Sequence, residues 1–323
     1  MKQNELSIRK RLFSKQNIYL ALYSVESYIS NRELLDKRDK EELNRLKDKF
    51  DEKNIEKWIE KVQERLYQLI DESHYLHARI FFKPKKYDIE NDKVVFRPLH
   101  SSSLLDQITA VSMLNILIYD FDADNKISMS NFSRLIPHNF YGNRVAYEPE
   151  KLFKPWQEQY KEYTSKANDY YKNFHDNGEY KWEVTLDLEN FFPSINPVCL
   201  YNYIVQQIPV EYSEDDKNML CKILEKLIFV EIEKLSKKDL DIYLGGKKHR
   251  NCRFAIGLPQ GLPQSYFLAN LLMVEVEKFY KKVLPGEMVF YVDDSAVFTN
   301  EIKDVADFGQ KIKDVNEKIT VWM

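Results

Sequence analysis

Apolar side chains near the N-terminus recur about every 3.6 positions, which is the spacing that one face of an α-helix produces. The residues on these apolar faces are Leu20, Tyr23 and Tyr28, and then Leu43, Leu46, Phe50, Ile55, Trp58, Ile59 and Val62. There is no proline before Pro84 and no glycine before Gly142, so the residues that most often interrupt helices are missing. We therefore predict a helical N-terminal region over residues 1–90, in which no chemistry is visible.

The next segment changes from a strand pattern to a helix pattern. VVFRPLHSSSLLDQ (Val94 to Gln107) begins as a short strand. The hydroxyl of Ser102 or Ser103 can then cap a helix over Leu104 to Tyr119. Asp120 to Asn131 is polar and is predicted to be a loop.

A group of aromatic residues between Pro149 and Trp182 falls at helical spacing: Trp156, Tyr160, Tyr163, Tyr170 and Phe174. The simplest interpretation is a helix that packs one aromatic face on the rest of the protein. The alternative is that some of these rings stack on nucleobases.

From Trp182 onward, short apolar strands alternate with polar loops and isolated helices, which is typical of an α+β domain. In EVTLDLENFF (Glu183 to Phe192), every second residue from Val184 to Leu188 is apolar. Successive side chains of a strand point to opposite faces, so Asp187 projects away from the apolar residues. We expect Asp187 near the end of this strand.

A second acidic site is predicted in EMVFYVDDSAVFTN (Glu287 to Asn300). Two runs of β-forming residues flank Val292, Asp293 and Asp294, so the adjacent acids should lie at the tip of a hairpin. Two neighbouring carboxylates repel each other unless a cation or a basic group compensates, which favours a metal site. The alternative is an ordinary solvated turn.

Three motifs follow one another in this part of the chain. They are LDLENFF (Leu186 to Phe192), GLPQG (Gly257 to Gly261) and YVDD (Tyr291 to Asp294). In this order and spacing they resemble the first catalytic aspartate motif, the PQG motif and the YxDD motif of reverse transcriptases. One departure is PQSYF after the second motif, where many relatives have a PxSP-type sequence.

Two upstream blocks resemble the bacterial members of this family. FRPLHSSSLLDQ (Phe96 to Gln107) is similar to their early fingers block. NFYGNR (Asn139 to Arg144) is similar to the block written SYGFR in intron enzymes. The resemblance extends from about Val94 to the C-terminus and is greatest to group II intron proteins, retron polymerases and phage-defence or abortive-infection reverse transcriptases.

The resemblance implies a catalytic role for three acids. Asp187 and Asp293 would bind Mg²⁺, with Mn²⁺ as a possible substitute, and Asp294 would be the third acid of the site. The carbonyl of Leu188 is an additional oxygen ligand on this view. Hard cations such as Mg²⁺ prefer carboxylate and phosphate oxygens, so these residue types suit that ion.

The resemblance also implies nucleotide contacts. Phe192 matches the aromatic position that crowds the sugar 2′-hydroxyl, although it can equally be a core phenylalanine. Gln260 and Gly261 match residues that pack against the incoming nucleotide and the template strand. Arg144 and Arg97 are candidates for binding the triphosphate, and the alternatives for each are a backbone phosphate or a structural ion pair.

The net charge does not indicate nucleic-acid binding, but two local basic clusters do. A formal net charge of −3 argues against a protein that coats nucleic acid over its whole surface. Basic residues gather in FFKPKK (Phe81 to Lys86) and in KKHRNCR, where we expect Lys247, Lys248 and Arg250, together with Tyr291 of the hairpin, to contact nucleic acid. The alternative is that both basic clusters are solvated loops.

The expected fold is therefore α+β, with the fingers and palm of a right-hand polymerase, an antiparallel palm sheet and a YxDD hairpin. The predicted divisions are a helical N-terminal region at 1–90, fingers at 91–181 and a palm at 182–323 that is truncated before the thumb. The last segment has helical apolar spacing from Val305 to Ile319, and family members continue from there into a thumb. Three explanations are open, namely a fragment of a longer protein, a partner subunit that supplies the thumb, or a different use of the palm, and we favour the first.

The expected function is RNA-directed DNA synthesis from dNTPs on an RNA template, in bacterial antiviral defence, with a non-coding RNA or a partner subunit as the expected partner. A template-independent or protein-primed DNA polymerase is the first alternative. A catalytically silent RNA-binding scaffold with the same fold is the second. No apolar stretch reaches the roughly 18 residues of a membrane span, and no signal core is present at the N-terminus, so we expect a cytoplasmic protein.

Overall fold

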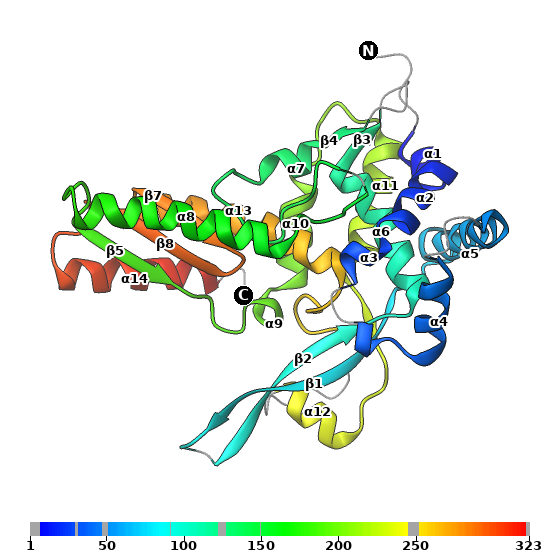
Figure 1. Ribbon diagram of the computed structural model, residues 1–323, viewed down its shortest axis with the longest axis horizontal. Helices are drawn as coiled ribbons and strands as arrows, with labels where there is room; N and C mark the ends of the chain where they lie inside the picture. The colour runs from blue at the N-terminus through cyan, green and yellow to red at the C-terminus, as the bar shows by residue number, and fades with distance from the viewer. Residues whose placement is uncertain are drawn as a thin grey trace.

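A computed structural model describes residues 7–29, 32–46, 51–90, 92–121, 127–148, 150–244 and 252–320 (Figure 1). The helices and strands before residue 136 are α1 (Ile8–Leu12), α2 (Lys15–Tyr23), α3 (Val25–Tyr28), η1 (Arg32–Leu34), α4 (Lys37–Leu46), α5 (Glu52–Ile70), β1 (His77–Asp88), β2 (Lys93–Ser101), α6 (Leu104–Ile118), β3 (Tyr119–Phe121), β4 (Ile127–Met129) and α7 (Asn131–Leu135). The later ones are α8 (Trp156–His175), β5 (Trp182–Leu186), α9 (Phe191–Ser194), α10 (Pro197–Val205), α11 (Glu214–Ile228), β6 (Glu231–Ile232), α12 (Lys237–Leu244), α13 (Pro263–Val283), β7 (Glu287–Tyr291), β8 (Asp294–Thr299) and α14 (Val305–Thr320). Small sheets among many helices make this an α+β fold, as predicted.

Helix α6 lies at the centre of the helical part of the molecule. All of its residues except Leu105 are buried, because α1, α2, α5, α11 and α13 pack around it. A helix that is apolar on every side is expected to be enclosed in this way. Its N-cap is Ser103, whose hydroxyl accepts a hydrogen bond from the backbone N–H of Asp106, which confirms one of the two predicted caps.

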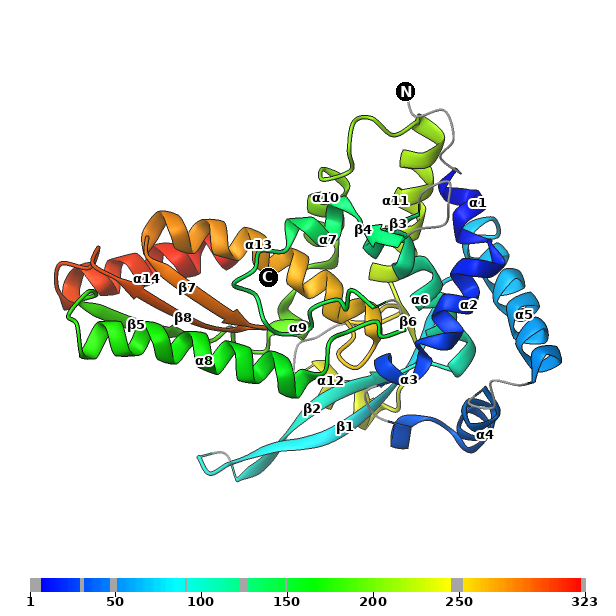
Figure 2. The same ribbon diagram turned by 45° about the horizontal axis from the view of Figure 1, so that its top comes forward.

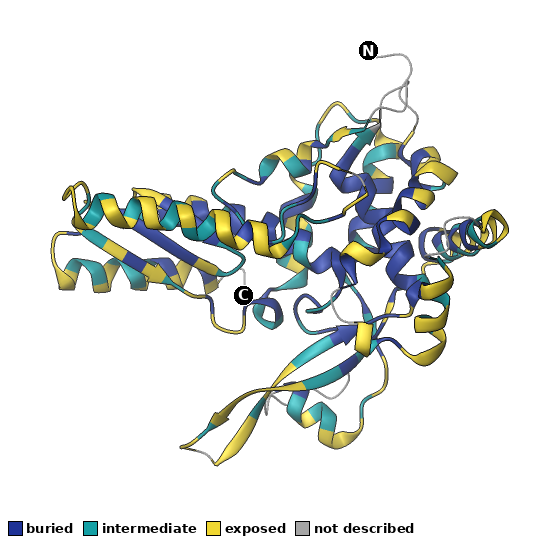
Figure 3. Cartoon of the chain, viewed as in Figure 1, coloured by how far each residue is buried: buried dark blue, intermediate teal, exposed yellow. Residues whose placement is uncertain are grey.

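The prediction of helix up to residue 90 is wrong for its last part. The N-terminal helices end with α5 at Ile70, and His77–Asp88 is strand β1, which pairs antiparallel with β2. The segment forms a strand because the backbone N–H and C=O groups of β1 pair with those of β2. The β1–β2 hairpin extends away from the body, and most of its outer half is exposed (Figures 1 and 3).

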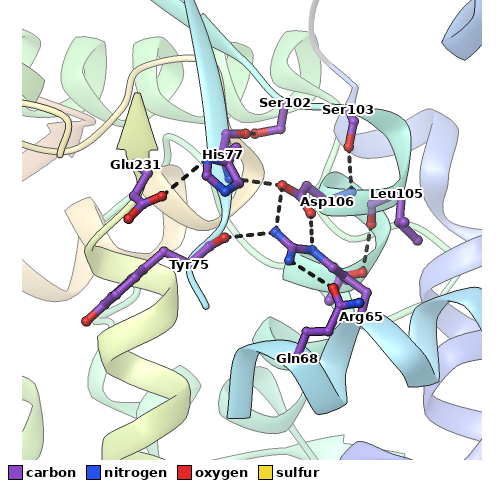
Figure 4. A network of polar contacts seen from close by, with 10 residues as sticks. Arg65, Gln68, Tyr75, His77, Ser102, Ser103, Leu105, Asp106 and Glu231 are labelled. Atoms are coloured by element: carbon purple, nitrogen blue, oxygen red, sulfur yellow. Dashed lines mark hydrogen bonds and ion pairs between the residues drawn. The ribbon is translucent and has the colours of Figure 1, made fainter. Parts of the chain in front are cut away.

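A buried ion pair connects α5, α6 and β1 (Figure 4). Arg65 donates from Nε to Asp106 Oδ1 at 2.7 Å and from Nη2 to the carbonyl of Tyr75 at 2.8 Å. Asp106 Oδ2 also accepts the backbone N–H of His77 at 2.9 Å. The side chains of Arg65 and Asp106 are only 11% and 7% exposed, so this pair holds the hairpin base against the helices without much access to water.

Asp120 to Asn131 is not simply a loop. Tyr119 pairs with Met129 as β3 and β4 form a short antiparallel ladder, and α7 begins at Asn131. Tyr119 is buried, and its packing stabilises this ladder. The polar sequence of the segment does not indicate this. Residues 122–126 lie outside the described part of the chain.

The acidic motifs lie on a three-stranded antiparallel sheet of order β5-β8-β7, called here the acid-bearing sheet. Helices α13 and α14 lie along one face and α8 along the other (Figures 1 and 2). On the α8 side, Tyr163, Tyr170 and Phe174 pack against a buried cluster of Val289, Ala296 and Phe298. This confirms the predicted helix and the packing of three of its five aromatic residues, whereas Trp156 and Tyr160 are exposed.

The helices of the described residues are all too short or too polar to cross a membrane.

Candidate active site

Asp187, Asp293 and Asp294 meet at one end of the acid-bearing sheet. Leu186 of β5 is level with Ser295 of β8, so Asp187, which follows β5, comes beside Asp294. Asp294 is also level with Tyr291 of β7, which leaves Val292 and Asp293 as the turn of the hairpin. The predicted strand end and hairpin tip are therefore confirmed, and the sheet brings them together.

The hairpin turn is supported by the NFYGNR segment. Asn139 and Tyr141 exchange backbone hydrogen bonds of 2.9 Å with Phe290, so this segment runs beside β7. Gly142 then passes so close to the turn that a Cβ there would lie 2.6 Å from Val292 Cγ2 and 2.7 Å from Val292 N. The turn residue Val292 has a left-handed φ of 60°, which is strained for a β-branched residue and depends on such enclosure.

The three acids influence one another electrostatically. Burial raises the pKa of Asp293 above its usual value, Asp294 and Asp187 raise it further, and Arg97 lowers it. Burial and Asp187 likewise raise the pKa of Asp294. Holding all three acids ionised therefore costs free energy, which a cation would offset.

The donor set is suited to a divalent cation, since it consists of carboxylate oxygens at the end of a sheet. Within the described residues, no three acidic, histidine or cysteine side chains are already arranged around one point. Asp187 thus lies near enough to Asp293 and Asp294 to raise their pKa values, but the three carboxylates do not yet surround a common point. Leu188, whose carbonyl was predicted as a further ligand, follows Asp187 directly and is buried.

Phe192 lies in a layer of aromatic rings. It is 7% exposed and packs against Phe191 and Tyr266, with ring centroids 5.4 and 5.9 Å apart. Its carbonyl accepts the backbone N–H of Leu258 at 2.9 Å, which joins the LDLENFF and GLPQG motifs. As described, Phe192 is therefore packed as a core residue.

Gln260 and Gly261 lie against the base of strand β2. The carbonyl of Gln260 accepts the backbone N–H of His100 at 2.8 Å. Gly261 has a φ of 113°, and a Cβ there would lie 2.6 Å from the carbonyl oxygen of His100. The second motif is thereby fixed to the β1–β2 hairpin, which also carries Arg97.

The two predicted arginines have different surroundings. Arg97 is exposed on β2, and its positive charge lowers the pKa of Asp293. Arg144 is half-buried, and its Nη1 donates to the carbonyls of Ile136 and Pro137 at 3.1 and 2.6 Å, which gives it a structural role. Arg144 is therefore not brought to the acids by any of these contacts.

Of the predicted nucleic-acid contacts, only Tyr291 can be placed. Its ring lies 5.3 Å from that of Tyr160 and 5.5 Å from that of Tyr163, both on α8. Tyr163 also has its pKa raised by burial and by Asp294, so α8 covers the face of the sheet on which Tyr291 and Asp294 lie. Lys247, Lys248 and Arg250 lie outside the described residues.

Two features of the site were missed in the sequence, namely the close approach of Gly142 to the turn and the contact of Tyr160 with Tyr291. The sequence shows only a glycine inside NFYGNR and tyrosines at helical spacing, and neither pattern indicates which residue lies in contact with it.

Gly257→Ala should destabilise the site strongly. Gly257 has a φ of 66°, and a Cβ there would overlap the carbonyl of Phe192 and lie 2.7 Å from the carbonyl carbon of Pro193. The left-handed conformation alone costs a non-glycine residue about 1–2 kcal/mol, and the backbone overlap adds to it. Urea unfolding should therefore show a loss of at least about 2 kcal/mol.

The matched control is Gly309→Ala in α14, where an added Cβ meets nothing within 4 Å. That change should leave the free energy of unfolding unchanged or raise it by about 0.5–1 kcal/mol, since alanine favours a helix. Equal effects of the two substitutions would contradict the tight contact at Gly257.

Acid should weaken the fold through His100. Burial lowers the pKa of His100 to about 4, from a usual value of 6.5. Between these pH values the unfolded chain binds a proton that the folded chain does not, so the free energy of unfolding falls as the pH falls, by about 3 kcal/mol in total from this group. Urea unfolding from pH 7 to pH 4 should show a smaller loss for His100→Gln. The exposed His74→Gln variant should behave like the original protein, and the same pH dependence in all three proteins would contradict the prediction.

Comparison with protein families gives one match over more than half of the chain. A family model described as reverse transcriptase (RNA-dependent DNA polymerase) matches residues 133–322, a range that contains all three acids and the GLPQG motif. No curated protein matches the chain.

Proposed function

Because the chain belongs to the reverse transcriptase family and is thus a nucleotidyltransferase, an RNA-directed DNA polymerase, we propose that Asp187, Asp293 and Asp294 form its polymerase centre. The observation that supports this assignment is the position of the three acids in the sheet. Asp187 from one motif and the Asp293–Asp294 pair from another lie at the same end of one sheet, and Asp187 raises the pKa of both Asp293 and Asp294. The acid-bearing sheet is on this view the palm, and the β1–β2 hairpin belongs to the fingers.

Reverse transcriptases generally use divalent metal ions, and we propose Mg²⁺ here, with Mn²⁺ as a substitute. Asp187 and Asp293 would hold the ions, and the carbonyl of Leu188 is a further ligand in this proposal. When bound, a pair of divalent ions would lower the pKa of the primer 3′-hydroxyl and neutralise the departing pyrophosphate. Arg97, whose charge lowers the pKa of Asp293, would bind the phosphates of the dNTP.

The sugar would be selected by Phe192. We expect Phe192→Val to raise the ratio of ribonucleotide to deoxynucleotide incorporation by about 10- to 100-fold, because a smaller side chain leaves room for a 2′-hydroxyl. Single-nucleotide incorporation with dTTP and UTP measures this ratio. Phe191→Val is the matched control, since Phe191 is equally buried beside it; an equal change in both variants would show general loosening instead of sugar selection.

We further infer that the protein acts in the antiviral defence of a bacterium, in the cytoplasm, on an RNA template and with a non-coding RNA or partner subunit. The support is the resemblance of FRPLHSSSLLDQ, NFYGNR and GLPQG to bacterial phage-defence reverse transcriptases.

The direct test is primer extension. The protein is incubated with Mg²⁺, four dNTPs and an RNA template carrying an annealed DNA primer, and the product is sequenced. DNA that copies the template supports the proposal. DNA made equally well without template would replace it with template-independent synthesis, and no DNA under any condition would favour a silent RNA-binding scaffold.

A further inference from the structure

A cavity of about 860 Å³ lies outside the polymerase centre, between the N-terminal helices and the start of α8. Its volume falls within the roughly 300–1,000 Å³ of sites that hold small organic ligands. Residues of α2, the 150–157 segment and the start of α13 line it together, so it is formed only when these distant parts of the chain have packed.

Aromatic rings form much of the wall. Tyr19 and Tyr23 of α2 are stacked at 6.2 Å and are 46% and 40% exposed, and Trp156 at the start of α8 is 64% exposed. Flat apolar rings that face water are unfavourable unless something covers them. Their π-faces suit the stacking of a planar ligand such as a nucleobase.

Positive charge borders the same cavity. Lys151 is exposed and has no ion pair among the described residues, while Lys154 lies 5.8 Å from the centroid of the Tyr147 ring. Of the two acids in the lining, Glu26 is already paired with Arg32, which leaves Glu150. Two amines beside stacked rings match a ligand that combines a base with a phosphate.

Tyr266 connects the cavity to the proposed sugar-selecting residue. It lines the cavity and packs against both Phe153, at 6.1 Å, and Phe192, at 5.9 Å. A ligand bound here would therefore lie one side chain behind the proposed sugar-selecting residue, but would not compete with an incoming dNTP.

We propose that this cavity binds an unpaired nucleobase with its phosphate, as part of a single-stranded nucleic acid or as a free nucleotide. The rings of Tyr19 and Trp156 stack on the base, and Lys151 contacts the phosphate. This site is separate from the proposed polymerase centre and does not depend on catalysis.

The test uses the full chain with Asp293→Asn, so that no synthesis occurs, and measures binding of a fluorescent oligo(dT) by anisotropy with unlabelled oligo(U) and free dTMP as competitors. A Tyr19→Ala, Trp156→Ala double variant should bind at least about tenfold more weakly, and Lys151→Glu should also weaken binding. Tyr67→Ala and Lys318→Glu are the controls, because both residues are exposed on other helices. Circular dichroism verifies that each variant is folded.

Tryptophan fluorescence gives an independent measurement. Trp156 lines the cavity, whereas Trp58 is buried and Trp182 lies in β5, so quenching by oligo(dT) should be clearly smaller in Trp156→Phe than in the original protein. Competition by dTMP as effective as by the strand would identify a free-nucleotide site, and much stronger competition by oligo(U) would identify a strand site. Binding that the cavity variants leave unchanged, quenching that is undiminished in Trp156→Phe, or no binding of any of these probes would overturn the proposal.

Discussion

Asp293→Asn should reduce primer extension by about 1,000-fold or more, because it removes a charged oxygen ligand from the proposed polymerase centre. Asparagine keeps the size of the side chain, so the hairpin turn at Val292 and Asp293 should be retained. Steady-state incorporation of dNTPs on a primed RNA template, with Mg²⁺ in excess, measures the effect. The matched control is Asp241→Asn, an exposed acid on α12 that should leave the rate unchanged.

The same substitution should make the folded protein more stable. Burial and the neighbouring acids raise the pKa of Asp293, so near neutral pH its ionised form opposes folding. A neutral amide removes that penalty, and the melting temperature without metal should rise. Loss of activity with a lower melting temperature would instead show that Asp293 is needed for the fold, and full activity would disprove its catalytic role.

Arg65→Met should lower the free energy of unfolding by about 3–5 kcal/mol, because it leaves the carboxylate of Asp106 buried without its cation. Asp106 would still accept the N–H of His77, but it would lose the bond of 2.7 Å from Arg65. Because Arg65 also binds the carbonyl of Tyr75, the substitution loosens the junction between α5 and the β1–β2 hairpin. Urea unfolding at neutral pH measures the loss.

Two variants test whether the buried charge is the cause. Lys15→Met breaks the exposed pair with Glu56 and should cost less than about 1 kcal/mol. The double variant Arg65→Met, Asp106→Leu removes both charges and should recover part of the stability that Arg65→Met loses. A double variant that is less stable than Arg65→Met would contradict the argument.

Local patterns in the sequence were sufficient for several elements. Alternation predicted β5, adjacent acids between two β-rich runs predicted the hairpin, and aromatic spacing predicted α8. In β5 and α8 the spacing of apolar residues predicts the element and also determines which of its faces is buried, so a local pattern is enough to predict both.

Other features depend on pairings that the local pattern does not reveal. The lack of early glycine and proline favours helix up to residue 90, but β1 pairs with the strand that directly follows it, Asp88 with Lys93, and this hairpin satisfies its backbone. Arg144 could equally have bound a phosphate, and only the fold shows that the carbonyls of Ile136 and Pro137 occupy its guanidinium. The proposed roles of Phe192 and Arg97 rest on resemblance together with position.

The pairing of β5 with β8 has a consequence for the timing of synthesis. Leu186 and Ser295 are neighbours in the sheet but leave the ribosome far apart in time. At about 5–20 residues per second, roughly 5–20 seconds separate the emergence of the two strands. During that interval Asp187 has neither of the other acids beside it, so the nascent protein cannot catalyse nucleotide addition. The helices around α6 can begin to pack earlier, and the protein can become an enzyme only after β8 has been made and has paired with β5.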